Sequence, residues 1–178
     1  AVGAEMGFSE QTIRKGLLNF KNTGMRQNIY KMGDVTVIED CYNASPSSMS
    51  ASLSVLSMIA QREGGRSIAV LGDMRELGDF SRALHEEVGA KVAEYHIDKL
   101  YTFGGDAAFI GHGAKKAGMD EQAVHSCRDL EDVKGLSAAL KSELGGTDVI
   151  LFKASRAVRL ERVIDDLKET GNAVDNRP

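Results

Sequence analysis

The stretch DVTVIEDCYNASPSSMSASLSVLSMIAQREGGRSIAVLG, residues 34–72, contains two short apolar runs on either side of one helical pattern. Residues 34–40 and 67–71 are rich in β-branched and other apolar side chains, and each run predicts a buried strand. Between them, apolar residues recur at spacings of four, three and four, which places them on one face of a helix. These residues are Met49, Leu53, Leu56 and Ala60. A strand, a helix and a strand in this order predict a βαβ unit with parallel strands.

The same alternation continues toward the C-terminus of the chain. Further strands are predicted at 99–103, 123–127 and 148–152, and further helices at 81–95, 106–117, 129–143 and 157–169. Short, continuously apolar strands between amphipathic helices indicate a parallel sheet that is covered on both faces. With right-handed crossovers, the predicted fold is α/β, a Rossmann-like, doubly wound and mostly parallel sheet.

Residues 1–33 do not follow this repeat. A helix is predicted over 9–20, with Ser9 as its N-cap, and Gly33-Asp34 is typical of a hairpin turn between NIYKM and VTVIE. We therefore expect residues 1–33 to be the end of a preceding domain and a hinge, and residues 34–178 to form the main domain.

Composition limits the classes of function. The chain has 178 residues, of which 42% are hydrophobic and 27% charged, as in an ordinary globular domain rather than a disordered one. The net charge of −4 argues against nucleic acid as a partner, and no run of about 20 apolar residues predicts a membrane span. Two cysteines without a framework of others favour free thiols in the cytoplasm. The first residues lack a signal-peptide pattern and no Met begins the chain, which fits an internal fragment or a processed terminus.

Ligands of open parallel sheets bind outside the carboxyl ends of the strands, so the residues that follow each strand are the candidate site residues. Asp40 could accept hydrogen bonds from ribose hydroxyls, and Ser45-Pro46 predicts a helix N-terminus that could receive an anion. Lys153 and Arg156 lie beside a later helix start, where cations could hold a carboxylate or a phosphate. The alternatives are that these residues are only caps, turns and a solvated basic face.

The loop GDMRELG, residues 72–78, is a second candidate. Gly72 would allow close backbone approach, and Asp73 could bind a cation or an amine, although an ordinary solvated turn is the simpler interpretation. Several chemistries are not supported, because the chain has no GxxxxGK[ST], GxGxxG, HExxH, CxxC or GxSxG motif. The four histidines are scattered and are interpreted as surface or packing residues.

Three segments carry a resemblance to a known family. CYNASPSSM (41–49) resembles D-x-Y-N-A-N-P-x-S-M, IAVLGDMRELG (68–78) with its following histidine resembles I-A-V-L-G-D-M-x-E-L-G…H-x-x-V-G, and VILFKASR (149–156) is similar to V-L-x-K-G-S-R. In this order and spacing, they resemble the C-terminal region of the Mur ligases, in the branch that adds D-alanyl-D-alanine. The chain departs from these patterns at Ser45 and Ala154.

The resemblance implies a fold, a reaction and partners. Residues 1–33 would be the end of the central ATPase domain, whose P-loop lies outside this chain, and 34–178 would be the Rossmann-like C-terminal domain. The full enzyme would be a cytoplasmic, monomeric ligase of peptidoglycan precursor synthesis that joins D-Ala-D-Ala to UDP-N-acetylmuramoyl-tripeptide through an acyl phosphate. ATP and Mg²⁺ would be held mainly by the central domain, and the rest of the protein would be the chain's own partner. We expect this fragment to be inactive alone and to bind neither nucleic acid nor membrane.

The resemblance also implies roles for individual residues. The ATP-binding residues would be Arg26, Asp40, Tyr42 and Asn43. The residues on the substrate side would be Asp73, Met74, Lys153, Ser155 and Arg156. No catalytic residue or metal ligand is expected in this chain. Two alternatives stay open, namely another Mur-like or folylpolyglutamate synthase-like amide ligase and a non-catalytic Rossmann-like binding module.

Overall fold

The computed structural model describes residues 2–19 and 26–172. Three parts of the expectations lie outside these residues: the last position of the helix predicted over 9–20, the segment 20–25 that leads into the hinge, and residues 173–178 at the end of the main domain.

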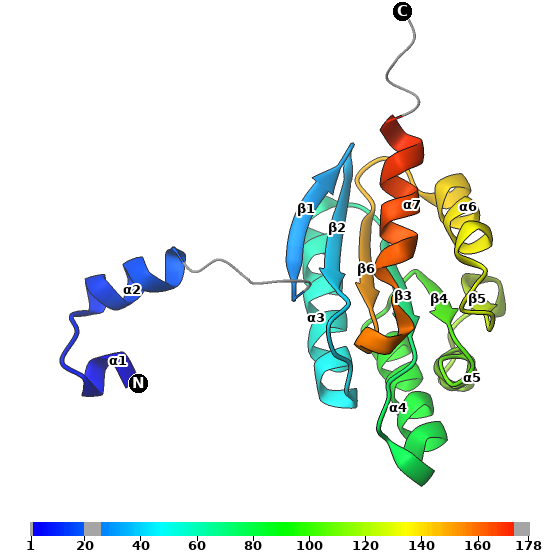
Figure 1. Cartoon of the computed structure of the whole chain (residues 1–178), viewed down its shortest axis with the longest axis horizontal. Helices are drawn as coiled ribbons and strands as arrows, with labels where there is room; N and C mark the ends of the chain where they lie inside the picture. Colours follow the sequence, from blue (N-terminus) through cyan, green and yellow to red (C-terminus); the bar gives the residue numbers. More distant parts are fainter. Residues whose placement is uncertain (1, 20–25, 173–178) are drawn as a thin grey trace, which may run out of the picture.

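One six-stranded sheet organises the main domain, and its strand order is β1-β2-β6-β3-β4-β5 (Figure 1). The strands are β1 (Asn28–Met32), β2 (Val35–Asp40), β3 (Ser67–Gly72), β4 (Lys99–Phe103), β5 (Val124–Cys127) and β6 (Val149–Lys153). All neighbouring strands are parallel except β1, which pairs with β2 as the expected antiparallel hairpin. The predicted α/β, doubly wound and mostly parallel sheet is therefore confirmed.

Helices cover both faces of this sheet, because its central strands are apolar on both sides (Figure 1). Residues of α3 (Pro46–Glu63), α4 (Ser81–Glu94) and α5 (Ala108–Lys116) form the core on one face. Residues of α6 (Val133–Glu143) and α7 (Glu161–Asn172) form the core on the other. Short 3₁₀ turns occur at η1 (Gly78–Phe80), η2 (Glu121–Ala123) and η3 (Arg156–Val158). In the described part of the chain, no helix combines the length and apolar character that crossing a bilayer requires.

Two helices begin four residues later than the sequence predicts. The helix expected over 129–143 begins at Val133, because the Asp132 carboxylate accepts the Gly135 amide and caps the helix there. The helix expected over 157–169 begins at Glu161, because η3 comes first and Arg159 then adopts a left-handed φ of 56° that no helix continues through.

Two helices precede the sheet. The expected helix is α2 (Glu10–Leu18), with Ser9 as its N-cap, and the sequence did not predict the short α1 (Val2–Glu5) before it. Neither helix buries any residue.

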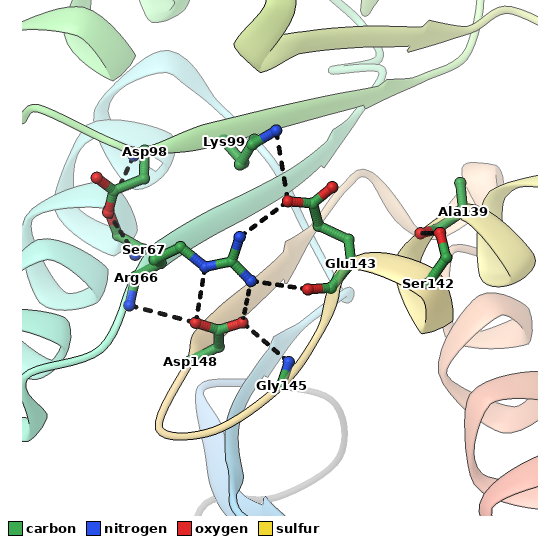
Figure 2. Close-up of polar contacts among 9 residues, drawn as sticks. All are labelled: Arg66, Ser67, Asp98, Lys99, Ala139, Ser142, Glu143, Gly145 and Asp148. Carbon is green, nitrogen blue, oxygen red and sulfur yellow. Dashed lines mark hydrogen bonds and ion pairs between the residues drawn. The ribbon is translucent and has the colours of Figure 1, made fainter.

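An ion-pair network joins the elements at the amino edge of the sheet, the end where the parallel strands begin (Figure 2). The Arg66 guanidinium lies between the carboxylate of Asp148, at 2.6 Å, and that of Glu143, at 2.9 Å, while Lys99 approaches Glu143 from the other side at 3.4 Å. Burial favours a raised pKa for Asp148, but hydrogen bonds from Arg66 and from the Gly145 amide outweigh burial and lower this pKa. The network therefore ties the starts of β3, β4 and β6 to the end of α6, at the edge opposite the candidate site.

Candidate functional site

The connections of the sheet change direction at β6. The helices that follow β2 and β3 pack on one face, whereas α7, which follows β6, packs on the other. Where neighbouring connections diverge in this way, a crevice opens outside the carboxyl ends of the strands, and ligands of open α/β sheets bind there. The loops after β2, β3 and β6 are therefore the candidate site.

A pocket of about 310 Å³ lies beside the ends of β2 and β6. Its lining brings together three of the four residues expected to bind nucleotide with one residue expected on the substrate side. The lining residues are Arg26, Gln27, Asp40, Asn43, Ser45, Ser48 and Lys153. Cationic, acidic and amide groups in one small pocket suit a ligand that carries both hydroxyls and negative charge.

A buried ion pair forms one wall of this pocket. Asp40 and Lys153 are paired positions at the ends of β2 and β6, and Lys153 Nζ lies 2.5 Å from Asp40 Oδ2. The two side chains are only 10% and 2% exposed, respectively. Lys153 Nζ also donates to the Asn43 carbonyl oxygen at 3.0 Å, and Ser52 Oγ donates to Asp40 Oδ2 at 3.0 Å. The end of β6, the end of β2 and the following loop are thus joined through one ammonium group.

The loop after β2 leads into the N-terminus of α3. Ser45 is the N-cap, Pro46 is the first helical residue, and Ser45 and Ser48 form a reciprocal capping box, as Ser45-Pro46 predicts. Asn43 Oδ1 accepts the Ala44 amide at 2.9 Å, which leaves the Asn43 side-chain NH₂ group directed away from that bond.

An aromatic side chain contacts Arg26, one of the residues that line the pocket. Tyr42 is 45% exposed, and the Arg26 guanidinium lies 4.2 Å from the centre of its ring. Arginine on one face of an exposed ring is a favourable cation–π arrangement, and it holds the segment before β1 against the loop after β2. All four residues expected to bind nucleotide, Arg26, Asp40, Tyr42 and Asn43, are therefore neighbours in the structure.

The loops after β3 and β6 are bonded to one another. The Ser155 amide donates to the Asp73 carbonyl oxygen at 3.1 Å, and the Arg75 amide donates to Ser155 Oγ at 2.9 Å. Gly72 permits this contact, because a Cβ there would lie 2.7 Å from the Cβ of Ala154. Gly72 therefore allows close packing between the two loops, and its nearest neighbour is the Ala154 side chain.

The Asp73 carboxylate is buried and mainly holds this loop in place. It accepts the Ala107 amide at 2.7 Å and pairs with Arg75 at 3.3 Å, with 3% of its side chain exposed. Gly104 makes room for it, since a Cβ at that position would lie 2.3 Å from Asp73 Oδ1. Met74 is buried in the core, so its side chain serves packing. Arg156, by contrast, is 56% exposed and pairs with Glu161 at 3.1 Å.

His85 is a site-supporting residue that sequence reasoning assigned only to packing or the surface. It is fully buried, accepts the Met74 amide through Nε2 at 3.0 Å and contacts the Ser81 carbonyl oxygen through Nδ1 at 2.7 Å. A carbonyl oxygen can only accept, so Nδ1 carries the proton and Nε2 the lone pair. In the sequence, the signal for this role is a histidine seven residues after GDMRELG. The structure adds that its hydrogen-bond partner, the Met74 amide, lies within that loop.

Comparison with known proteins shows the family of this chain. Residues 25–156 match the family model described as "Mur ligase, glutamate ligase domain", which is well over half of the chain. The chain belongs to the Mur ligase family. The matched segment begins just before Arg26 and ends at Arg156, so it spans both groups of loops at the carboxyl edge.

Individual Mur ligases match nearly the whole chain. It is 39% identical over 172 residues to the UDP-N-acetylmuramoyl-tripeptide–D-alanyl-D-alanine ligase of Bacillus subtilis, covering 96% of this chain and 36% of that protein. The same enzyme of Synechocystis sp. is 36% identical over 163 residues, covering 91% and 34%. The crystal structure of MurF ligase from Thermotoga maritima in complex with ADP aligns with a TM-score of 0.78 at 28% identity, covering 97% and 36%. The chain thus spans about a third of the length of these relatives.

Proposed function

We propose that this chain is the C-terminal region of an ATP-dependent ligase that joins D-Ala-D-Ala to UDP-N-acetylmuramoyl-tripeptide in peptidoglycan precursor synthesis. The similarity of nearly the whole chain to two ligases of that name carries the proposal. The tripeptide carboxylate would be phosphorylated by ATP, and the dipeptide amine would then attack the acyl phosphate, forming the amide and releasing phosphate. Within this scheme, residues 1–33 belong to the end of the central domain and the hinge, with β1 contributing to the sheet of the domain at 34–178.

We assign the pocket at the ends of β2 and β6 to the nucleotide. The Asp40 carboxylate accepts hydrogen bonds from ribose hydroxyls, the Asn43 amide and the Tyr42 ring contact the base, and Arg26 neutralises phosphate charge. The ADP-bound structure of a relative supports a nucleotide as a ligand of the full-length protein. The chemistry of the lining, with one carboxylate, two side-chain amides and one exposed guanidinium, fits a ligand of this composition.

We assign the joined loops after β3 and β6 to the incoming dipeptide. Arg156 is the more exposed of the two arginines in these loops and receives the dipeptide carboxylate, while Asp73 and Ser155 fix the loops that present it. The role of this region is therefore to bring the amine to an acyl phosphate that is formed in the central domain.

The remaining partners follow from the same proposal. Within residues 2–19 and 26–172, no three His, Cys, Asp or Glu side chains are placed to hold a metal ion together. We propose that Mg²⁺ is held mainly by the central domain, where it would neutralise charge on the transferring phosphoryl group. We propose a cytoplasmic, monomeric enzyme whose C-terminal region acts with its own central and N-terminal domains.

A phosphate-release assay of the full-length protein tests this proposal. With ATP and UDP-N-acetylmuramoyl-tripeptide present, D-Ala-D-Ala should release phosphate, whereas glutamate, lysine and single D-Ala should not. Release with a single amino acid and none with the dipeptide would instead support another Mur-like or folylpolyglutamate synthase-like ligase. The 178-residue chain alone should hydrolyse no ATP, and robust hydrolysis by it would contradict the assignment of phosphoryl transfer to the central domain.

A further inference from the structure

Lys153 was expected on the substrate side, yet its ammonium group is bonded to residues of the nucleotide pocket. Both acceptors found for Nζ lie around the end of β2: Asp40 Oδ2 at 2.5 Å and the Asn43 carbonyl oxygen at 3.0 Å. With 2% of its side chain exposed, Lys153 is almost completely shielded from solvent. Ser155, two residues further on, bonds instead to the loop after β3. Within residues 153–156, Lys153 therefore contacts the pocket at the ends of β2 and β6, whereas Ser155 contacts the loop after β3.

The contacts of Lys153 determine which atoms of the loop face the pocket. Asp40 Oδ2 receives both Lys153 Nζ and Ser52 Oγ, so the carboxylate is held from two directions. Its other oxygen, Oδ1, has no hydrogen-bond partner among the residues that the structure describes, and it is the acceptor left for a ligand. The bond to the Asn43 carbonyl oxygen fixes the backbone that carries the Asn43 side chain into the same pocket.

A buried charge is stable only when it is paired and its hydrogen bonds are made. The Asp40–Lys153 pair meets this condition, because each partner also bonds to a neutral group, Ser52 Oγ for Asp40 and the Asn43 carbonyl for Lys153. A buried ammonium group that already donates hydrogen bonds to protein acceptors is poorly placed to bind the carboxylate of a dipeptide.

We infer that Lys153 is a positioning residue for the nucleotide site, which orients Asp40 and the loop at residues 41–45 and does not contact the amine substrate. The inference rests on the proposed assignment of this pocket to the nucleotide. It predicts that removing the ammonium weakens nucleotide binding and leaves the affinity for the amine unchanged.

The test compares Lys153→Met with the wild type in the full-length protein. Calorimetry with ADP should show a Kd raised about 10- to 100-fold, the equivalent of one charge-assisted hydrogen bond. The KM for ATP should rise in parallel, and the KM for the amine acceptor should change less than about twofold. A matched control is Lys99→Met, since Lys99 also forms an ion pair at the end of a strand but lies where the parallel strands begin, away from the pocket. In this control, neither the Kd for ADP nor the KM values should change.

Introducing Lys153→Met into the Asp40→Asn variant and measuring ADP affinity tests whether Lys153 acts through Asp40. Lys153→Met should weaken ADP binding less in this background than in the wild type, because part of its effect has already been lost. If thermal unfolding shows that Lys153→Met alone is not folded, the double variant, which has no unpaired buried charge, is compared with Asp40→Asn. The double variant should bind ADP more weakly than Asp40→Asn, since the anchor on the Asn43 carbonyl oxygen is also gone.

Three results would overturn the inference. They are a raised KM for the amine with unchanged ADP affinity, an unchanged ADP affinity in folded Lys153→Met, and an equal loss of ADP affinity in both backgrounds. ADP calorimetry needs no ligation, so it is independent of the substrate proposal. A wild-type enzyme that binds ADP but rejects D-Ala-D-Ala would refute the proposed function while leaving the role of Lys153 measurable.

Discussion

Replacing Asp148 by Asn should destabilise the domain by breaking the network at the amino edge of the sheet (Figure 2). Asp148 is 5% exposed and accepts Arg66 Nε at 3.0 Å, Arg66 Nη2 at 2.6 Å and the Arg66 and Gly145 amides at 3.3 and 3.0 Å. An asparagine side chain keeps one acceptor oxygen, but its NH₂ group would face the N–H donors of Arg66 and Gly145 and could not accept from them. A charge-assisted bond contributes roughly 1.5–3 kcal/mol, and Arg66 is 43% exposed, so screening reduces its share. We expect a loss of about 2 kcal/mol in the free energy of unfolding at neutral pH.

The pH dependence gives this prediction its sign. The folded-state pKa of Asp148 is lowered, so its stabilisation is fully present above the unfolded-state value of about 3.9 and is lost as pH falls through the folded-state value. The side-chain amide that Asp148→Asn introduces does not titrate in this range. The difference in stability between wild type and Asp148→Asn should therefore narrow as pH falls from about 7 to about 3.

Urea unfolding of the 178-residue chain, followed by far-ultraviolet circular dichroism, measures this difference. Asp34→Asn is the matched control, because Asp34 is exposed in the hairpin turn and its carboxylate has no hydrogen bond to the residues that the structure describes. The control should change stability by less than about 0.5 kcal/mol. A loss below about 0.5 kcal/mol for Asp148→Asn, or a difference that widens toward acid pH, would show that the ionised Asp148 carboxylate does not stabilise the domain in this way.

Three further substitutions test the candidate site. In the full-length enzyme, Arg156→Ala should raise the KM for D-Ala-D-Ala about tenfold while the KM for ATP stays constant, and an unchanged dipeptide KM would remove Arg156 from the site. Arg26→Ala should do the reverse, raising the KM for ATP about three- to tenfold, and a change confined to the dipeptide would contradict the assignment. His85→Ala should cost about 3 kcal/mol in urea unfolding of the chain, since it leaves a cavity and the Met74 amide without its acceptor; a cost below about 1 kcal/mol would show that the bond contributes little.

The sequence predicts the central strands β2, β3, β4 and β6 well, because they are buried on both faces and appear in the sequence as continuous apolar runs. Residues 99–103 form β4 as predicted, and Ser45-Pro46 marks the start of α3, since capping depends on neighbouring residues alone. The starts of α6 and α7 were less accurate. They depend on the Asp132 side-chain cap and on the left-handed backbone at Arg159, which helical periodicity does not reveal.

Contacts between distant residues were beyond sequence reasoning. Asp40 and Lys153 are 113 positions apart, and their pairing depends on β6 inserting between β2 and β3, an order that periodicity cannot give. The network around Arg66 joins residues 77 and 82 positions away for the same reason. Residue types at strand ends therefore located the site, while the strand order decided which of those residues share a pocket.

A crystal structure of the full-length protein with ADP would show directly which ligand the pocket beside the ends of β2 and β6 binds. We expect the adenosine to lie in this pocket, with a ribose hydroxyl on Asp40 Oδ1 and the Arg26 side chain toward the phosphates. Lys153 should remain bonded to Asp40 Oδ2. Adenosine bound without contact to Asp40 or Asn43 would show that this pocket is not the nucleotide site.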